Sequence, residues 1–207
     1  MKWPIGMRVL LTGSTGIAIL ATAGVGYSQD WLANQKCIRC DLTRIDLAYR
    51  DLQNINFQGT NFTFANLQET NLSGANLSGT RLIQTKLARA NLSNANLDAA
   101  NIVDTDLRDA NFQGASLEST RVMKVNLNGA QLIGAKMRGI NFSDTDLKNS
   151  DLRNSDLFAA NFVNADCRDA NFGGANLQGA NFSGAKLEGA SFNGANLKNV
   201  TLPSSFR

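Results

Sequence analysis

The sequence of 207 residues contains no histidine, and this absence limits the chemistry that the chain can perform. Without histidine, a Ser-His-Asp or a Cys-His catalytic arrangement is excluded. The chain also has no glycine-rich phosphate loop of the P-loop kind. Carboxylates are plentiful, but they recur along the chain as expected for a solvated surface. The sequence therefore predicts neither an enzyme nor a bound cofactor.

Cysteine is also scarce, with three residues in the whole chain, and two of them form the run Cys37-Ile38-Arg39-Cys40. Cysteines at this spacing can meet across a tight turn, within the Cα separation that a disulfide needs. A thioredoxin-type site would require a strand-to-helix context that is missing here. A zinc site would require two further ligands. We therefore predict a structural disulfide between Cys37 and Cys40, and no metal site.

What the chain does contain is a period of five residues. Every fifth residue from Leu42 to Leu202 is apolar, mostly Leu or Phe, without any insertion or deletion. A small side chain, typically Ala or Thr, lies two residues before most of these, and Asn or Asp usually lies one residue before. Ile45, Arg50 and Ile55 replace the small residue in the first repeats. The apolar position is varied by Ile102, Val122, Met137 and Cys167. Such an unbroken repeat is the main feature that any fold must accommodate.

A period of five fits neither regular secondary structure. On an α-helix at ~100° per residue, an apolar stripe would turn by ~140° in each repeat and would be spread around the whole cylinder. On a continuous strand, an odd repeat would place successive apolar residues on opposite faces. A short extended piece followed by a bend keeps each of them pointing inward. The period therefore predicts a solenoid with its core inside the coil.

Runs such as Ala75-Asn76-Leu77-Ser78-Gly79 and Ala180-Asn181-Phe182-Ser183-Gly184 resemble the pentapeptide repeat family. The resemblance implies an all-β fold, a right-handed four-sided parallel β-helix with four repeats in each coil. About eight coils of about 20 residues, stacked at ~4.8 Å, would make a rod roughly 40 Å long.

Residues 1–28 differ from the rest of the chain. Lys2 and Arg8 precede an uncharged stretch from Val9 to Ser28, and Ala21-Thr22-Ala23 matches a small-x-small cleavage pattern. This is the layout of a secretory signal peptide, and an uncleaved membrane anchor is the alternative. In both cases the positive end stays in the cytoplasm and the repeats are exported.

The remaining boundaries follow from the repeat. Residues 29–39 precede it, and we expect them to form a short capping helix over the first coil, with Asp30 as N-cap. Residues 40–202 form the β-helix. Residues 203–207 form a tail that is too short for a complete cap.

One column of outward positions is unusually apolar. Residues directly after the inward position are mostly polar, but Ile83, Val103, Met123 and Val163 stack at intervals of 20 and are interrupted only by Ser143. Contiguous exposed apolar groups often mark an interface, although β-branched residues also suit a strand-like wall. We expect this face to dock a protein partner or a second copy of the chain. An adjoining column would supply a basic rim suited to an acidic partner or an anionic lipid surface: Arg108, Lys148 and Arg168.

Two classes of function are open to such a protein. The first is a non-enzymatic, exported scaffold, because the resemblance extends to secreted members that reach the periplasm or the thylakoid lumen. The second is a mimic of duplex DNA that binds topoisomerase, as some family members do. The second requires a strongly negative surface, whereas this chain has 20 basic and 17 acidic residues. We therefore expect a protein partner or self-association, no nucleic acid, and membrane contact only through an uncleaved N-terminal segment.

Overall fold

A computed structural model describes residues 7–12, 16–21 and 35–204 of the chain. Within these residues it contains strands and no helix. The strands β1 (Met7–Thr12) and β2 (Gly16–Ala21) pair in antiparallel orientation. None of the described residues belongs to a helix long and apolar enough to cross a membrane. The strands β3 (Arg81–Ile83), β4 (Asn101–Val103) and β5 (Arg121–Met123) form a parallel sheet in this order.

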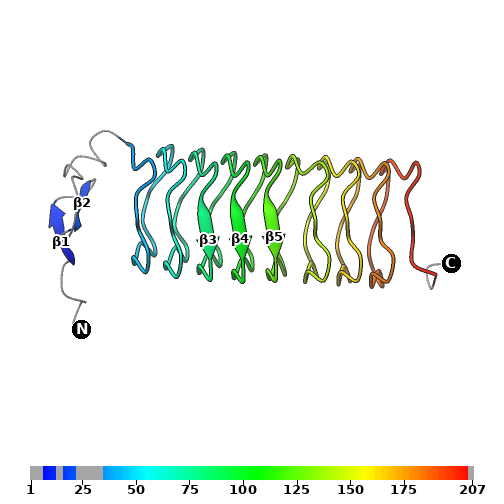
Figure 1. Cartoon of the computed structure of the whole chain (residues 1–207). Coiled ribbons are helices and arrows are strands. Elements are labelled where there is room, and N and C mark those ends of the chain that lie inside the picture. Colours follow the sequence, from blue (N-terminus) through cyan, green and yellow to red (C-terminus); the bar gives the residue numbers. More distant parts are fainter. Residues whose placement is uncertain (1–6, 13–15, 22–34, 205–207) are drawn as a thin grey trace.

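Residues 35–204 form a right-handed four-sided parallel β-helix, as the sequence predicts, and its coils stack into a rod (Figure 1). Each coil contains 20 residues, because parallel bridges join residues that are 20 apart, from Lys36↔Asn56 to Asn181↔Thr201. Backbone hydrogen bonds connect successive coils. For example, the amide of Leu67 donates to the carbonyl of Lys86 over 2.8 Å. Every coil therefore depends on its two neighbours for its backbone partners, as in other solenoids.

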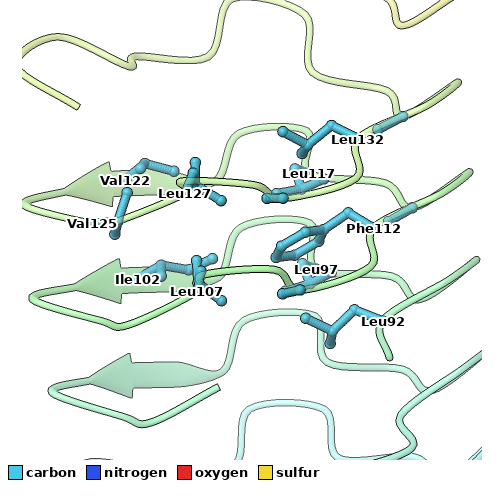
Figure 2. Close-up of a cluster of buried hydrophobic side chains, with 14 of the residues drawn as sticks. Leu92, Leu97, Ile102, Leu107, Phe112, Leu117, Val122, Val125, Leu127 and Leu132 are labelled. Atoms are coloured by element: carbon cyan, nitrogen blue, oxygen red, sulfur yellow. The ribbon is translucent and has the colours of Figure 1, made fainter. Parts of the chain in front are cut away.

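In the coils drawn in Figure 2, the apolar residue of each repeat points into the coil. At the C-terminal end of the rod, Leu197 and Leu202 are 41% and 39% exposed. Leu67, Leu107 and Leu147 are at most 2% exposed, and Cys167 lies fully buried in the same column. Phenylalanine rings stack along the rod axis in the last coils. The rings of Phe162 and Phe182 are 4.5 Å apart and parallel. The predicted inward register is thus confirmed, and a continuous apolar column forms the core.

The corner of each repeat has a left-handed backbone. Every fifth residue from Arg39 to Asn199 has a positive φ. Glycine tolerates this conformation best, and Asn and Asp tolerate it better than other side chains. Glycine fills some of these corners, and many of the others carry Asn or Asp. The corner residue thus turns the chain from one face of the rod to the next.

The asparagines of the repeat bind the backbone and one another. Asn71 accepts a hydrogen bond from the amide of Ser73 over 3.2 Å. It also donates one to Asp51 in the preceding coil, over 2.8 Å. Asn91 in turn donates to Asn71 over 3.1 Å. These side chains close the turn within a coil and connect successive coils along the rod, which is a structural role.

The start of the repeat region differs from the expectation. Residues 29–34 of the expected cap lie outside the described residues, as does most of the expected export segment. Residues 35–39 form a further unit of the β-helix, so the expected helix is wrong for these residues. The reason is that Cys37 occupies the inward position, where it is 3% exposed. Lys36 pairs with Asn56 of the next coil.

Candidate functional site

Three successive coils carry true strands on one side of the rod, and these strands form the candidate site. The register pairs Ile83 with Val103, and Val103 with Met123. It also pairs Asn101 with an arginine on either side. We call this surface the β3–β5 face, and its outward residues are Arg81, Ile83, Asn101, Val103, Arg121 and Met123.

The strands form at corners where the flanking residues favour an extended backbone over a tight turn. In an ordinary repeat, the backbone amide of the residue after the corner donates a hydrogen bond to the carbonyl of the inward residue. Ala65 donates to Phe62 in this way over 2.9 Å. Within the described residues, the amides of Cys40 and Ile55 lack this bond beside ordinary turns, and the amides of Thr85, Thr105 and Val125 lack it after β3, β4 and β5. At the corners after these three strands, a large apolar residue precedes the corner and a β-branched residue follows it. Such residues favour an extended backbone, so the strand continues where other coils turn.

The β3–β5 face is apolar along its centre. Ile83 and Val103 are half-buried, and Met123 is 40% exposed. The predicted stripe is therefore contiguous over three coils. Val163 lies two coils beyond Met123, and the coil between them carries Ser143 and an ordinary turn. The structure thus groups three of the four predicted residues and leaves Val163 apart from them.

Cations border this apolar centre. Arg81, Arg121 and Lys124 are exposed, and within residues 35–204 none of them forms an ion pair. Asp104 lies at the same corner as Lys124, one coil earlier, and accepts a hydrogen bond from Gln84 over 2.7 Å. The face therefore combines an apolar stripe with three cations that form no ion pair within residues 35–204.

Asn101 is the exception among the asparagines of this side of the rod. Elsewhere the side-chain oxygen accepts the amide two residues later, as in Asn141 with Ser143 and Asn161 with Val163, both over 3.1 Å. The Oδ1 atom of Asn101 is buried and, among the side chains of the described residues, is the one buried polar atom without a hydrogen-bond partner. An unpaired buried acceptor is costly, so this position would gain from an added donor.

The predicted basic rim does not supply free charge. Arg108 contacts Asp106 at 2.7 Å, Lys148 contacts its own aspartate at 3.1 Å, and Arg168 contacts Asp166 at 2.6 Å. Each aspartate lies two residues earlier in the same repeat, on the same face of the rod. The hydrogen bond from Arg168 lowers the pKa of Asp166, and the hydrogen bond from Arg108 lowers the pKa of Asp106. The rim is therefore a row of local ion pairs, which corrects the expectation of an open basic surface.

Two hollows lie beside the β3–β5 face, and the sequence did not predict them. One has a volume of about 330 Å³ and lies at the corner after β4 and β5, between Asp104, Lys124 and Arg108. The other, of about 310 Å³, lies over Ala88 between Gln68 and Arg108. The signal for the second was Ala88 itself, a small residue at an outward position where the neighbouring coils carry long side chains. Both hollows carry charges of both signs.

The cysteines occupy the positions that their spacing suggested. Cys37 and Cys40 form a disulfide, with their Cα atoms 5.5 Å apart. It joins an inward position to the start of the next repeat, at the first described coil. Cys167 is a free, buried thiol. Within the described residues, no group of three or more His, Cys, Asp or Glu side chains is placed to hold a metal ion.

Two models of known protein families match most of the repeat region. A family model described as pentapeptide repeats (8 copies) matches residues 40–79 and 75–114. A second model, described as a pentapeptide repeat region, matches residues 125–202. No curated protein matches the chain.

Solved structures of pentapeptide repeat proteins are similar to this chain at low sequence identity. A trypsin-treated variant of QnrB1, a plasmid-mediated fluoroquinolone resistance protein, is 18% identical with a TM-score of 0.52, over 78% of this chain and 85% of that one. HetL from the cyanobacterium Nostoc sp. strain PCC 7120 is 24% identical with a TM-score of 0.29, over 83% and 91%. A thylakoid lumen protein from Arabidopsis thaliana is 25% identical with a TM-score of 0.28, over 58% and 66%.

Proposed function

The chain belongs to the pentapeptide repeat family, and on that premise we propose that it is an exported, non-enzymatic scaffold that binds protein through its β3–β5 face. The observation that carries this proposal is the apolar stripe of Ile83, Val103 and Met123. It is bordered by cations that form no ion pair in the part of the rod that the structure describes. Elsewhere on the rod, arginines such as Arg108 and Arg168 are neutralised within their own repeat. This face therefore combines the two properties of a protein-binding surface, apolar area and complementary charge.

The proposal of export rests on the N-terminal sequence. Lys2 and Arg8 followed by the uncharged stretch to Ser28 are typical of a signal peptide or an anchor. A disulfide at Cys37 and Cys40 suits an oxidising compartment such as the periplasm or the thylakoid lumen. Cell fractionation, with sequencing of the mature N-terminus, tests this part. Recovery of the intact chain in the cytoplasm with both cysteines reduced would contradict it.

Mimicry of duplex DNA is the less supported alternative. The likeness to QnrB1 concerns the fold alone at 18% identity. A duplex mimic needs a strongly negative surface, whereas this chain carries 20 basic and 17 acidic residues. No observation on the β3–β5 face favours a topoisomerase as partner.

Paired substitutions on two faces test the proposed binding surface. Val103→Lys with Met123→Lys adds two charges to the stripe, and we expect it to abolish capture of bound protein in a pull-down from the native compartment. The matched control is Gln113→Lys with Ile133→Lys, which adds the same charges at the same repeat position on another face. We expect the control to keep capture and both variants to melt close to the parent. Equal capture by the parent and both variants would show that the stripe has only a structural role in the wall of the β-helix.

A further inference from the structure

The β3–β5 face is self-complementary, and we propose that its occupant is a second copy of this chain, bound with the two rods antiparallel. This inference rests on the proposed binding function of the face and specifies the partner. It follows from the order of charges on three coils and from the unpaired atom of Asn101.

The geometry follows from a two-fold axis that runs parallel to the strands and passes between β4 and β5. Such an axis keeps the strands of both sheets running in the same direction while it reverses the rods. Each position of the repeat then faces the same position in the second copy, with β4 opposite β5. Packed sheets with nearly aligned strands are a common arrangement, and two-fold dimers are the commonest oligomers.

This placement matches the outward residues of β4 and β5 with suitable partners. Val103 packs against the second copy's Met123, whereas Arg81 and Ile83 of β3 face the coil of the second copy that carries Asn141 and Ser143. Asp104 faces the second copy's Lys124, which has no ion pair within the described part of the chain. Asn101 faces the second copy's Arg121. Since the axis is two-fold, each of these contacts forms twice.

The contact with Arg121 also addresses the unpaired acceptor. Asn101 is half-buried, and its Oδ1 has no hydrogen-bond partner among the described residues. A rotation of the side-chain amide turns this oxygen outward, where a guanidinium from the second copy can donate to it. Arginine is well suited to this role because it presents several donors in a fixed plane.

Other two-fold placements of the same face are less favourable. An axis through β4 brings Arg81 against the second copy's Arg121, and an axis through β5 brings Lys124 against Lys124. An axis along the rod through the strand centres brings Arg121 against Met123 and so places a cation on the apolar stripe. An axis between β3 and β4 avoids like charges, but Asp104 then faces Gln84 and no ion pair forms. The order of charges therefore selects the axis between β4 and β5.

The face is only three coils tall, about 5 Å per coil, so a dimer that rests mainly on it is weak and concentration-dependent. Its test is a charge exchange in the full-length chain, followed by sedimentation velocity over a range of concentrations. Lys124→Asp alone places aspartates against Asp104, and Asp104→Lys alone places lysines against Lys124. We expect each single variant to weaken self-association by at least about tenfold, with a melting curve close to that of the parent.

Mixing the two single variants provides the decisive arm. One chain then carries only lysines and the other only aspartates at the two corners, so the mixture forms a heterodimer although neither variant self-associates. The double variant Asp104→Lys with Lys124→Asp regains the parental affinity to within about threefold. Higher salt weakens the parent dimer because its ion pairs are exposed.

Three results would overturn the inference: a parent that stays monomeric at every concentration, a dimer unaffected by Lys124→Asp, or a mixture that fails to associate. The proposed function fails by a different measurement. If Val103→Lys with Met123→Lys loses a bound protein other than this chain while the parent is monomeric, the binding face stands and self-association is wrong.

Discussion

At the scale of single residues, the corner glycines show how the repeat balances backbone strain against space. Gly74 and Gly79 have nearly equal φ, +66° and +64°. A Cβ at Gly79 would meet nothing within 4 Å, whereas a Cβ at Gly74 would overlap Oδ1 of Asn54 in the preceding coil. The backbone cost of alanine is therefore the same at both corners, and the steric cost differs.

We accordingly expect Gly79→Ala to lower the free energy of unfolding by about 1 kcal/mol, the cost of a left-handed alanine. Gly74→Ala should cost about 0.5–1 kcal/mol more, because Asn54 must leave its rotamer. Chemical denaturation of both variants checks the difference. Adding Asn54→Gly to Gly74→Ala should remove the extra loss, and an unchanged difference would refute the steric explanation.

The three cysteines should react differently with thiol reagents. Burial raises the pKa of Cys167 to about 12, so its thiol stays protonated and inaccessible in the folded chain. Cys37 and Cys40 are bonded to each other. We expect no labelling of the native protein, one labelled residue after denaturation without reductant, and three after reduction. Labelling of Cys37 and Cys40 without reductant, in protein taken from its native compartment, would contradict the disulfide.

The ion pairs on the face next to β3–β5 predict a weak dependence of stability on pH. The pKa of Asp166 is lowered in the folded chain, first by the hydrogen bond from Arg168. Its contribution is therefore present above the unfolded pKa of about 3.9 and is lost as pH falls through the lowered folded value. Asp166→Asn should lower the melting temperature at pH 7 by at most about 3 °C. The difference should vanish near pH 2, and a difference that grows with acid would reverse the assigned sign.

At the scale of the repeat, inward and outward positions differ in their tolerance of charge. Leu127 is 2% exposed, whereas Asn128 is half-buried at the surface and keeps an acceptor if it becomes aspartate. We expect Leu127→Asp to cost more than about 3 kcal/mol, because it buries an unpaired carboxylate. Asn128→Asp should change stability by less than about 0.5 kcal/mol. Equal effects in thermal melts would contradict the inward register.

The regular solenoid could be predicted from the sequence, but the departures of individual coils from it could not. The unbroken period from Leu42 to Leu202 requires an inward residue in every repeat, so the solenoid and its columns could be derived. The open corners at β3, β4 and β5 could not be derived, because they depend on the combination of the residue before the corner and the residue after it. A rule based on one position would have assigned Val163 to the same strands, and the alanine after its corner allows the ordinary turn instead.

The candidate site was predicted in part for a similar reason. The apolar stripe follows directly from the 20-residue stacking. The pairing of Arg108 with Asp106 depends on side-chain conformations within one repeat, which the column pattern does not show. Conversely, that Arg121 forms no ion pair within residues 35–204 can be established only when the neighbouring coils are in place.

At the scale of the whole molecule, the residues that stabilise the rod differ from the residues to which we assign recognition. The coils stack into a rod (Figure 1). Its core is a continuous column inside the coils, and backbone hydrogen bonds between coils stabilise the walls. The outward residues can therefore vary with little effect on the fold. Among them, the β3–β5 face joins an apolar centre to unneutralised charge, and we assign recognition to it.

Photo-crosslinking from a single coil tests this assignment most directly. A photoreactive residue would replace Val103, Gln113 or Glu118, which lie on three different faces of the rod, in the full-length chain in its native compartment. We predict crosslinked adducts from position 103 and background levels from positions 113 and 118. Adducts of equal yield from all three positions, or from every position except 103, would contradict the claim that this protein acts through the β3–β5 face.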